Sequence, residues 1–394
     1  MGGALAALPV VVVTGMRQVG KTTFLWNQLG LGQRRRLSLD DFATLEAARR
    51  DPEAFVAGDV PLVIDEVQRV PELLLAIKSR IRGRPAPGHF VLSGSANLLL
   101  MAKVTESLAG RALYLSMWPM TRRELRRIPT PPFLLSTLES GEPPDVDGAR
   151  RVSPEEVLAG GMPQVAVNRV DPASWFTGFG QTYLERDIRE LSQVADLVQF
   201  RRFMRLLAMR TGKMLNVAEV SRDAGLSSAT GQRYVGLIET SFAGFRLPPF
   251  LASRSSRLVK SPKFYISDAG LASDLIGDRG VPMGPADPYA GALLETYVAQ
   301  NLQGILSAWL PRASLCYWCV QGRQEVDFVV EHQGRCLAIE VKSASRWSPG
   351  DVIGLRRFVE STPSCVAGIL ACGTASTHRL GERLFVAPLS ALLE

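Results

Sequence analysis

Short apolar runs alternate with segments of helical spacing in the first third of the chain. The runs have the length of buried strands, and the segments between them place apolar residues three and four positions apart. Strands that alternate with helices predict a three-layer α/β domain with a mostly parallel sheet. The expected elements cover residues 10–14, 23–29, 37–39, 62–64, 73–81, 90–93 and 113–115.

A different pattern begins after residue 128. Prolines and glycines cluster between positions 129 and 148, which indicates a linker or a surface excursion. Residues 155–200 then have helical spacing, with acidic and basic side chains interleaved. This part of the chain is therefore expected to be a helical connection.

The next segment spaces its apolar residues like a helix-turn-helix. Val217 and Val220 face inward on the first helix, Ala224 and Gly225 make the tight turn, and Ser227 caps the second helix. The apolar side of that second helix consists of Tyr234, Leu237 and Ile238. The alternating positions that follow predict a β-hairpin wing, so the segment is interpreted as a winged helix.

The last part of the chain predicts another α/β domain. An amphipathic helix surrounds Glu295, residues 316–320 form an apolar run, and a second strand carries Asp327. A turn at Gly334 leads into C-L-A-I-E-V-K-S, where Glu340 and Lys342 alternate with apolar residues and project from one strand face.

Composition adds limits to this picture. A chain of 394 residues suggests two or three domains, and none of its segments has the roughly 18 uninterrupted apolar residues of a membrane helix. The first residues lack a basic start, so we expect neither a signal peptide nor a membrane association. The five cysteines include one isolated C-x-x-C, Cys316 to Cys319, which is interpreted as buried thiols in a reducing cytoplasm.

The clearest chemical motif is V-V-V-V-T-G-M-R-Q-V-G-K-T-T at residues 10–23. It has the spacing G-x-x-x-x-G-K-T between an apolar strand and a helix, which is the context of a phosphate-binding loop. Backbone amides and the helix N-terminus bind phosphate, Lys21 reaches the β- and γ-phosphates, and Thr22 holds Mg²⁺. The predicted nucleotide-binding residues are Gly15, Met16, Arg17, Gln18, Val19, Gly20, Lys21, Thr22 and Thr23.

A carboxylate pair ends the strand of residues 62–64. Ligands bind at the carboxyl edge of parallel strands, so Asp65 is expected to complete the Mg²⁺ shell through water. Glu66 is the expected general base for the water that attacks the γ-phosphate. The alternative is a helix N-cap. A further strand runs into Ser93, Ser95 and Asn97, which are candidates for sensing the γ-phosphate or orienting water, or for a plain helix cap.

Residues 201–263 carry an unusual charge. They hold 12 Lys and Arg against three acids, a net +9 in a chain of +7, so the rest of the chain sums to −2. A winged helix with this charge is suited to DNA or RNA; an acidic protein partner, or packing between domains, also fits. The candidate nucleic-acid contacts are Ser228, Thr230, Arg233, Arg254, Arg257 and Lys260.

A second constellation lies near the C-terminus. A helix carboxylate, a strand aspartate and Glu-x-Lys on the next strand form the arrangement of a metal-dependent phosphodiesterase. Asp327 and Glu340 would hold a second Mg²⁺ or a Mn²⁺, Glu295 would add or orient a ligand, and Lys342 would position the attacking water. The alternative is a strand with a solvent-facing glutamate and lysine.

These motifs, in this order, resemble one family over nearly the whole chain. The chain is similar to bacterial and archaeal AAA+-like ATPases that join an N-terminal P-loop domain to a C-terminal domain of unknown function with a PD-(D/E)XK-nuclease-like fold. The similarity lies in G-M-R-Q-V-G-K-T-T, L-S-L-D-D, V-I-D-E-V-Q, L-S-G-S-A-N-L, S-L-A-G-R and W-P-M-T-R-R-E-L, and then in G-G-M-P, T-Y-L-E-R-D-I, S-P-K-F-Y-I-S-D-A-G-L, L-L-E-T-Y-V, E-V-D-F and I-E-V-K.

The resemblance implies an α/β fold class with four parts. They are a P-loop domain at residues 1–128, a linker and helical region at 129–200, a basic winged-helix-like domain at 201–268 and a PD-(D/E)XK-nuclease-like domain at 285–394. It also implies ATP and Mg²⁺ as cofactors, a homo-oligomer, and Arg111 as a γ-phosphate-sensing arginine that acts in cis or from a neighbouring subunit. The alternative for Arg111 is a solvated arginine after a helix.

One departure from the family concerns the start of the chain. The family has a helical segment before the first strand that helps to enclose the adenine, whereas only nine residues precede Val10 here. Either the start codon is misassigned, or the base is recognised more loosely or by another part of the protein.

Three functions follow as hypotheses. The first is a cytoplasmic ATPase whose cycle moves or gates the C-terminal domains on nucleic acid. The second is an ATP-regulated, metal-dependent nuclease. The third is a nucleotide-switched DNA-binding regulator or antitoxin-like protein with an inert nuclease fold.

Overall fold

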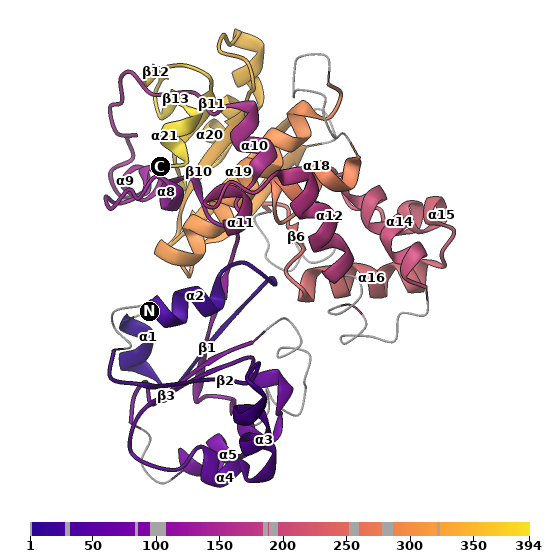
Figure 1. Cartoon of the computed structure of the whole chain (residues 1–394). Coiled ribbons are helices and arrows are strands. Elements are labelled where there is room, and N and C mark those ends of the chain that lie inside the picture. The colour runs from indigo at the N-terminus through magenta and orange to yellow at the C-terminus, as the bar shows by residue number, and fades with distance from the viewer. Residues whose placement is uncertain are drawn as a thin grey trace. The chain divides into compact units, whose positions relative to one another are not determined.

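The computed structural model describes residues 2–27, 32–82, 86–94, 108–183, 188, 196–251, 260–277, 287–320 and 324–394 (Figure 1). The chain forms two compact units. The first unit comprises Met1–Trp118, Thr182–Ala195 and Thr240–Phe242, and the second comprises Pro119–Gln181, Asp196–Glu239 and Ala243–Glu394. Among the described residues, no helix has the length and apolar character needed to cross a membrane.

The first unit is built on a five-stranded parallel sheet. Its strands lie in the order β2-β3-β4-β1-β5, and every neighbouring pair runs parallel. The strands are β1 (Val10–Gly15), β2 (Arg35–Ser38), β3 (Leu62–Asp65), β4 (Phe90–Ser93) and β5 (Ala112–Met117). The predicted parallel sheet is therefore confirmed, with β4 lying between β1 and β3 although it follows both along the chain.

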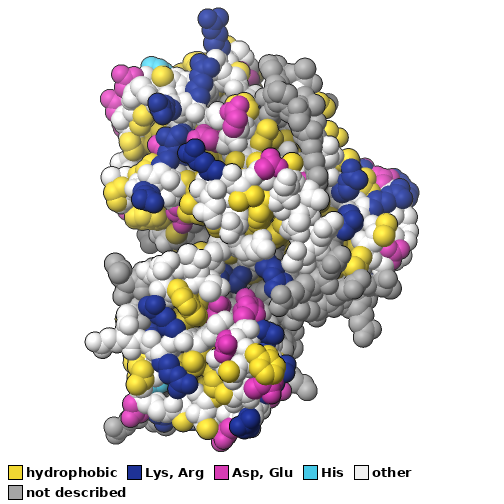
Figure 2. Space-filling view, in the orientation of Figure 1, with side chains coloured by type: hydrophobic (Ala, Val, Ile, Leu, Met, Phe, Trp, Pro, Cys, Tyr) yellow, Lys and Arg dark blue, Asp and Glu magenta, His cyan; other side chains and the backbone are white. Residues whose placement is uncertain are grey.

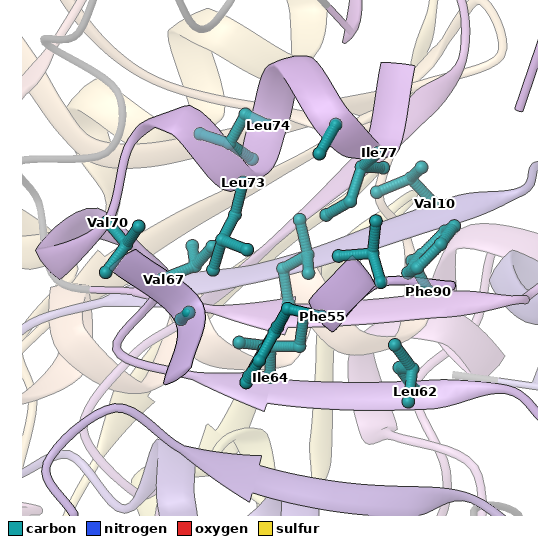
Figure 3. Close-up of a cluster of buried hydrophobic side chains, with 14 of the residues drawn as sticks. Val10, Phe55, Leu62, Ile64, Val67, Val70, Leu73, Leu74, Ile77 and Phe90 are labelled. Carbon is teal, nitrogen blue, oxygen red and sulfur yellow. The ribbon is translucent and has the colours of Figure 1, made fainter. Parts of the chain in front are cut away.

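Both faces of this sheet are buried. On one face, Val10 and Val12 pack with residues of α3 (Phe42–Arg50), α4 (Pro52–Phe55) and α5 (Glu72–Arg80), as Figure 3 shows for Phe55, Leu73 and Ile77. On the other face, Val13 packs with Leu25 of α2 (Lys21–Asn27) and Leu5 of α1 (Gly2–Ala7). Alternation along β1 thus sends its valines into two helical layers, as a buried parallel strand requires.

The structure moves some predicted bounds in this unit. The helix expected from residue 23 begins at Lys21, and the strand expected at residues 37–39 is β2, Arg35–Ser38. Arg35 joins the sheet because its amide donates to Pro61 O, so the ladder with β3 starts before the apolar residues of the strand. The short helix α1 was not predicted.

The second unit contains most of the helices. Those described are α8 (Arg122–Leu125), α9 (Phe133–Ser140), α10 (Pro154–Ala159), α11 (Pro163–Ala166), α12 (Pro172–Thr182), α14 (Leu197–Ala208), α15 (Val217–Ala224), α16 (Ser228–Thr240), α18 (Ala269–Ile276), α19 (Ala290–Trp309), α20 (Ile353–Ser361) and α21 (Leu389–Leu392). A separate antiparallel pair joins β6 (Gly244–Leu247) to β7 (Lys263–Ile266).

The two helices predicted in the basic segment are confirmed as α15 and α16. Val217 and Val220 are buried, and α15 ends at Gly225, whose φ of 75° lies in the left-handed region. Ser227 Oγ accepts a hydrogen bond of 3.1 Å from the Thr230 amide, as a helix cap does.

A six-stranded mixed sheet forms the C-terminal part of the second unit. Its order is β12-β13-β11-β10-β9-β8, with parallel pairs between β10 and β11 and between β11 and β13. The strands are β8 (Ser314–Val320), β9 (Gln324–His332), β10 (Arg335–Val341), β11 (Cys365–Cys372), β12 (His378–Gly381) and β13 (Leu384–Pro388). Leu355 and Phe358 of α20 pack on one face of this sheet.

A buried carboxylate links two motifs of the second unit. Asp268 is fully buried. Its carboxylate accepts a hydrogen bond of 2.9 Å from the Leu271 amide at the start of α18 and one of 2.7 Å from the Gly161 amide. A Cβ on Gly161 would lie 2.2 Å from Met120 O, so only glycine allows this approach. The motifs G-G-M-P and S-D-A-G-L are therefore parts of one contact, in which Asp268 of the second accepts from the Gly161 amide of the first.

Replacing Asp268 by alanine is expected to destabilise the second unit by about 2–4 kcal/mol. The change removes a helix cap and leaves the buried Gly161 amide without its acceptor. Urea unfolding of the full chain, followed by tryptophan fluorescence, measures the loss. Asp171→Ala, which removes the exposed acceptor of the Ser174 amide, is the matched control and is expected to cost about 1 kcal/mol or less.

The same carboxyl gives this stability a pH dependence. Burial raises the pKa of Asp268 from 3.8 to about 6, so between these values the folded chain binds a proton that the unfolded chain has lost. The part of the stability that comes from the proton on Asp268 is therefore greatest below pH 4 and is lost as the pH rises through about 6, while its role as a hydrogen-bond acceptor remains. The free energy of unfolding, plotted against pH between 4 and 6, should therefore fall more steeply for the wild type than for Asp268→Ala. Equal slopes would contradict the raised pKa of Asp268.

Candidate nucleotide site and carboxylate cluster

The phosphate-binding loop joins β1 to α2 at the carboxyl edge of the first unit's sheet. Gly15 ends β1 with a φ of 150°, and a Cβ at this position would lie 2.2 Å from Met117 O on β5. The first glycine of the motif is therefore required by the approach of the neighbouring strand. Gln18, in the middle of the loop, also has a left-handed backbone, with a φ of 60°.

Lys21 folds back over this loop. It begins α2, is only 6% exposed, and its Nζ donates to Gly15 O at 3.0 Å and to Met16 O at 2.9 Å. The ammonium is thus held beside the backbone that binds phosphate, where phosphate oxygens would replace these two carbonyl oxygens as acceptors.

Three predicted residues meet beside the loop. Thr22 Oγ1 donates to Asp65 Oδ2 at 2.7 Å, and Ser93 Oγ donates to Asp65 Oδ1. Asp65 ends β3, Ser93 ends β4, and both are almost completely buried. A hydroxyl that faces a buried carboxylate next to a phosphate loop fits Mg²⁺, so Thr22 and Asp65 would hold the ion and it would neutralise phosphate charge.

Glu66 follows Asp65 in a left-handed conformation, with a φ of 57°. Its carboxylate accepts a hydrogen bond from Gln68 Nε2. Burial raises the pKa of Glu66 above its ordinary value, and the Lys21 ammonium opposes that rise. A carboxylate with these neighbours is suited to accept a proton from water. Gln68 was not among the predicted site residues, although it lies in the motif V-I-D-E-V-Q.

Two further predictions for this site have other outcomes. Ser95 and Asn97 lie outside the described residues. Arg111 precedes β5, and the parallel register that pairs Val10 with Ala112 places it at the amino edge of the sheet. The loop after Gly15 lies at the opposite edge, about 17 Å away at about 3.3 Å per residue. The expectation that Arg111 acts in cis is therefore wrong, and its action from a neighbouring subunit stays a prediction.

The four residues of the predicted nuclease centre come together in the second unit. Glu295 lies on α19 and Asp327 on β9. Glu340 is the last residue but one of β10, and its carboxylate lies 2.9 Å from Lys342 Nζ. Asp327 Oδ2 accepts a hydrogen bond of 2.8 Å from the Val341 amide, which connects β9 to β10 beside Glu340. Burial, with the carboxylates of Glu295 and Glu340, raises the pKa of Asp327.

Three residues of this place were missed by sequence reasoning. Lys263 of β7 donates to Glu295 Oε1 at 3.0 Å and forms an ion pair with Glu325. Tyr265 donates its hydroxyl to the same Glu295 oxygen. We call Lys263, Glu295, Glu325, Asp327, Glu340 and Lys342 the carboxylate cluster. The alternation of Lys263 and Tyr265 in K-F-Y-I-S-D was the available signal, but Lys263 was counted only as a basic charge.

The candidate nucleic-acid contacts lie on α16 and near β7. Ser228 and Arg233 are exposed, and the Arg233 guanidinium lies 5.7 Å from the centre of the Tyr234 ring. Thr230 is half-buried and hydrogen-bonds to Ser227, while Lys260 is exposed. Arg254 and Arg257 lie outside the described residues.

The phosphate loop, Lys21, Thr22 and the strand-end carboxylates define the first unit as an AAA-type P-loop domain, and the protein as a P-loop ATPase. Residues 8–126 match the family described as an AAA domain. Residues 151–280 and 290–392 match two families described as domains of unknown function, DUF8612 and DUF4143.

Two relatives extend the similarity over most of the chain. The uncharacterized proteins Mb2031c of Mycobacterium bovis and Rv2008c of Mycobacterium tuberculosis are each 30% identical over 346 residues, which is 87% of this chain and 72% of theirs. The chain belongs to the family of these mycobacterial proteins. The Walker-type ATPase paby2304 of Pyrococcus abyssi matches 70% of this chain and 93% of its own at 13% identity, with a TM-score of 0.41, which is too low to establish a shared fold.

Proposed function

We propose that the ATPase cycle of the first unit controls the affinity of the basic helices of the second unit for nucleic acid. ATP and Mg²⁺ bind at the loop of Gly15–Thr22, and Glu66 activates the attacking water. The observation that carries the proposal is the set of exposed cations on and around α14–α16. Figure 2 shows dark-blue side chains gathered over α14 and α15.

Three described cations of this segment are paired with carboxylates. Lys263 is buried among carboxylates, Arg210 pairs with Asp223, and Arg246 pairs with Glu239 at 3.1 Å. The exposed cations that remain among the described residues are Arg201, Arg202, Arg205, Lys213, Arg222, Arg233 and Lys260. A group of cations on one helical segment supports phosphate binding, because neutralised phosphates release counterions.

Nucleic-acid affinity and its salt dependence test this proposal. Fluorescence anisotropy with duplex DNA, single-stranded DNA and RNA is expected to show binding by the wild type. Arg222→Ala/Arg233→Ala is expected to weaken it about tenfold and to lower the salt slope by about 2. Arg356→Ala, which changes an exposed arginine of α20, is the matched control and is expected to leave both values unchanged.

ATP turnover is measured by phosphate release over the same range of nucleic-acid concentrations. We expect nucleic acid to raise the ATPase rate of the wild type, and the double variant to need more nucleic acid for the same rise. If Arg356→Ala weakens binding as much as the double variant does, the effect comes from net charge and not from the basic helices. The absence of binding and of stimulation would overturn the proposal and leave an acidic protein partner for the same helices.

We also infer a homo-oligomer. Arg111 lies at the edge of the sheet opposite the phosphate loop, so it would reach a γ-phosphate only in a neighbouring subunit.

A further inference from the structure

The carboxylate cluster surrounds a buried lysine. Lys263 is 5% exposed as a residue, and its Nζ lies 3.0 Å from Glu295 Oε1 and 4.0 Å from Asp327 Oδ1 while pairing with Glu325. These carboxylates come from α19 and β9, and β10 supplies Glu340 beside them. An ammonium therefore lies where the predicted metal would need its ligands.

One oxygen of each of the three carboxylates predicted to hold the metal already accepts from a protein donor, while Glu340 Oε2 is buried without a hydrogen-bond partner in the part of the chain that the structure describes. Glu295 Oε1 accepts from both Lys263 and Tyr265, Asp327 Oδ2 accepts from the Val341 amide, and Glu340 Oε1 accepts from Lys342. A divalent ion needs several free oxygens at about 2.0–2.6 Å. Among the described residues, His, Cys, Asp and Glu form no group of three or more that could hold a metal ion. The residues therefore do not fit the second Mg²⁺ or Mn²⁺.

The lysine is fixed in this place by the fold around it. Lys263 pairs with Leu247 across β6–β7, and it forms an isolated bridge with Met214 at the end of the helical segment before α15. Its ammonium also lies 5.7 Å from the centre of the Tyr317 ring. Burial alone would lower the pKa of Lys263, but the carboxylates of Glu295, Asp327 and Glu325 raise it, so the side chain stays charged.

We propose that the Lys263 ammonium is the resident cation of the carboxylate cluster and takes the place of a divalent metal. The cluster then ties β7, and with it the basic helical segment, to α19 and β9 by ion pairs, and it has no metal with which to cleave nucleic acid. This inference does not depend on the proposed function, because loss of nucleic-acid binding would leave it unchanged.

Mn²⁺ binding to the full chain without nucleotide tests the proposal. Free Mn²⁺ is followed by electron paramagnetic resonance. Wild type and Asp327→Asn are expected to bind the same amount. Lys263→Met, which keeps the length of the side chain but not its charge, is expected to gain an additional ion that Lys263→Met/Asp327→Asn loses. Lys263→Arg keeps a cation and is expected to gain none.

Two results would overturn the proposal. One is Mn²⁺ binding by the wild type that Asp327→Asn removes, and this comparison holds even where Lys263→Met does not fold. The other is a folded Lys263→Met, judged by circular dichroism, that gains no ion.

Cleavage gives a second readout. Supercoiled plasmid is incubated with the full chain and Mg²⁺ or Mn²⁺, with and without ATP. The wild type is expected to nick it no faster than Glu340→Ala or Lys342→Ala. Nicking that both variants abolish would also overturn the proposal.

Discussion

Replacing Lys21 by alanine is expected to reduce kcat/KM for ATP by about 100-fold to 1,000-fold, because the variant loses the charge that stabilises the transferred phosphoryl group. The ammonium is buried and lies beside the loop backbone, bonded to Gly15 O and Met16 O. Phosphate release under saturating Mg²⁺ measures the rate.

A control separates lost chemistry from lost folding. Lys78→Ala removes a lysine from α5 of the same unit and is expected to keep the wild-type rate. Thermal unfolding of Lys21→Ala should stay close to that of the wild type, since its two hydrogen bonds go to loop carbonyls that water can satisfy. Near-normal turnover by Lys21→Ala would place the measured activity at another site or in another protein.

The nucleotide site could be predicted from sequence because its parts are local or follow a general rule. The loop of Gly15–Thr22 is contiguous along the chain. Asp65 and Ser93 end buried strands, and the carboxyl ends of parallel strands share one edge of a sheet. The structure joins both to Thr22 by hydrogen bonds, directly or through Asp65.

Arg111 could not be placed in the same way. Its motif, S-L-A-G-R, shows that an arginine precedes a strand, but the sequence does not show which edge of the sheet it reaches. The parallel pairing of Val10 with Ala112 decides this, and it depends on contacts between segments about a hundred residues apart.

Lys263 shows a different limit. A count of charges treats every lysine alike, whereas the structure buries this one among carboxylates from two other elements. Four members of the carboxylate cluster were predicted from sequence: Glu295, Asp327, Glu340 and Lys342. The cation that changes their chemistry lies on a strand assigned by sequence to a different domain.

The alternating pattern of the C-terminal strands predicted β8, β9 and β10 but not their place in the sheet. β10 pairs in parallel with β11, and β11 with β13, across connections that contain α20 and β12. Parallel pairing leaves no turn signal in the sequence, because the partners are joined by a crossover and not by a hairpin.

Glu66→Gln is expected to keep ATP binding and to lose hydrolysis. The amide has the shape of the carboxylate and can still pair with Gln68, but it cannot accept a proton from water, so kcat falls by about 100-fold to 10,000-fold. Lys21, Thr22 and Asp65 are untouched, so the affinity for ATP is expected to change by less than about threefold. Fluorescent ATP analogues measure affinity, and single-turnover experiments measure hydrolysis.

The pH profile of the wild type connects this loss to Glu66. Burial raises the pKa of this carboxyl from its ordinary 4.5, so the base becomes protonated, and kcat falls, at a higher pH than an exposed glutamate would give. In Glu66→Gln the residual rate should lack this acid limb. Glu72→Gln changes an acid in the first turn of α5 and is expected to keep both the rate and the limb.

Mixtures of the two proteins extend the test to assembly. A Glu66→Gln chain binds ATP without hydrolysing it, so in a homo-oligomer it would hold its neighbours at one step of the cycle. Adding it to the wild type is then expected to lower the ATPase activity by more than dilution does. If Arg111 acts on the next subunit, Glu66→Gln/Arg111→Ala should inhibit the mixture less than Glu66→Gln does. Activity that falls only in proportion to the wild-type fraction would contradict coupling between subunits, and it would leave Arg111, at the far edge of its own sheet, without a role in hydrolysis.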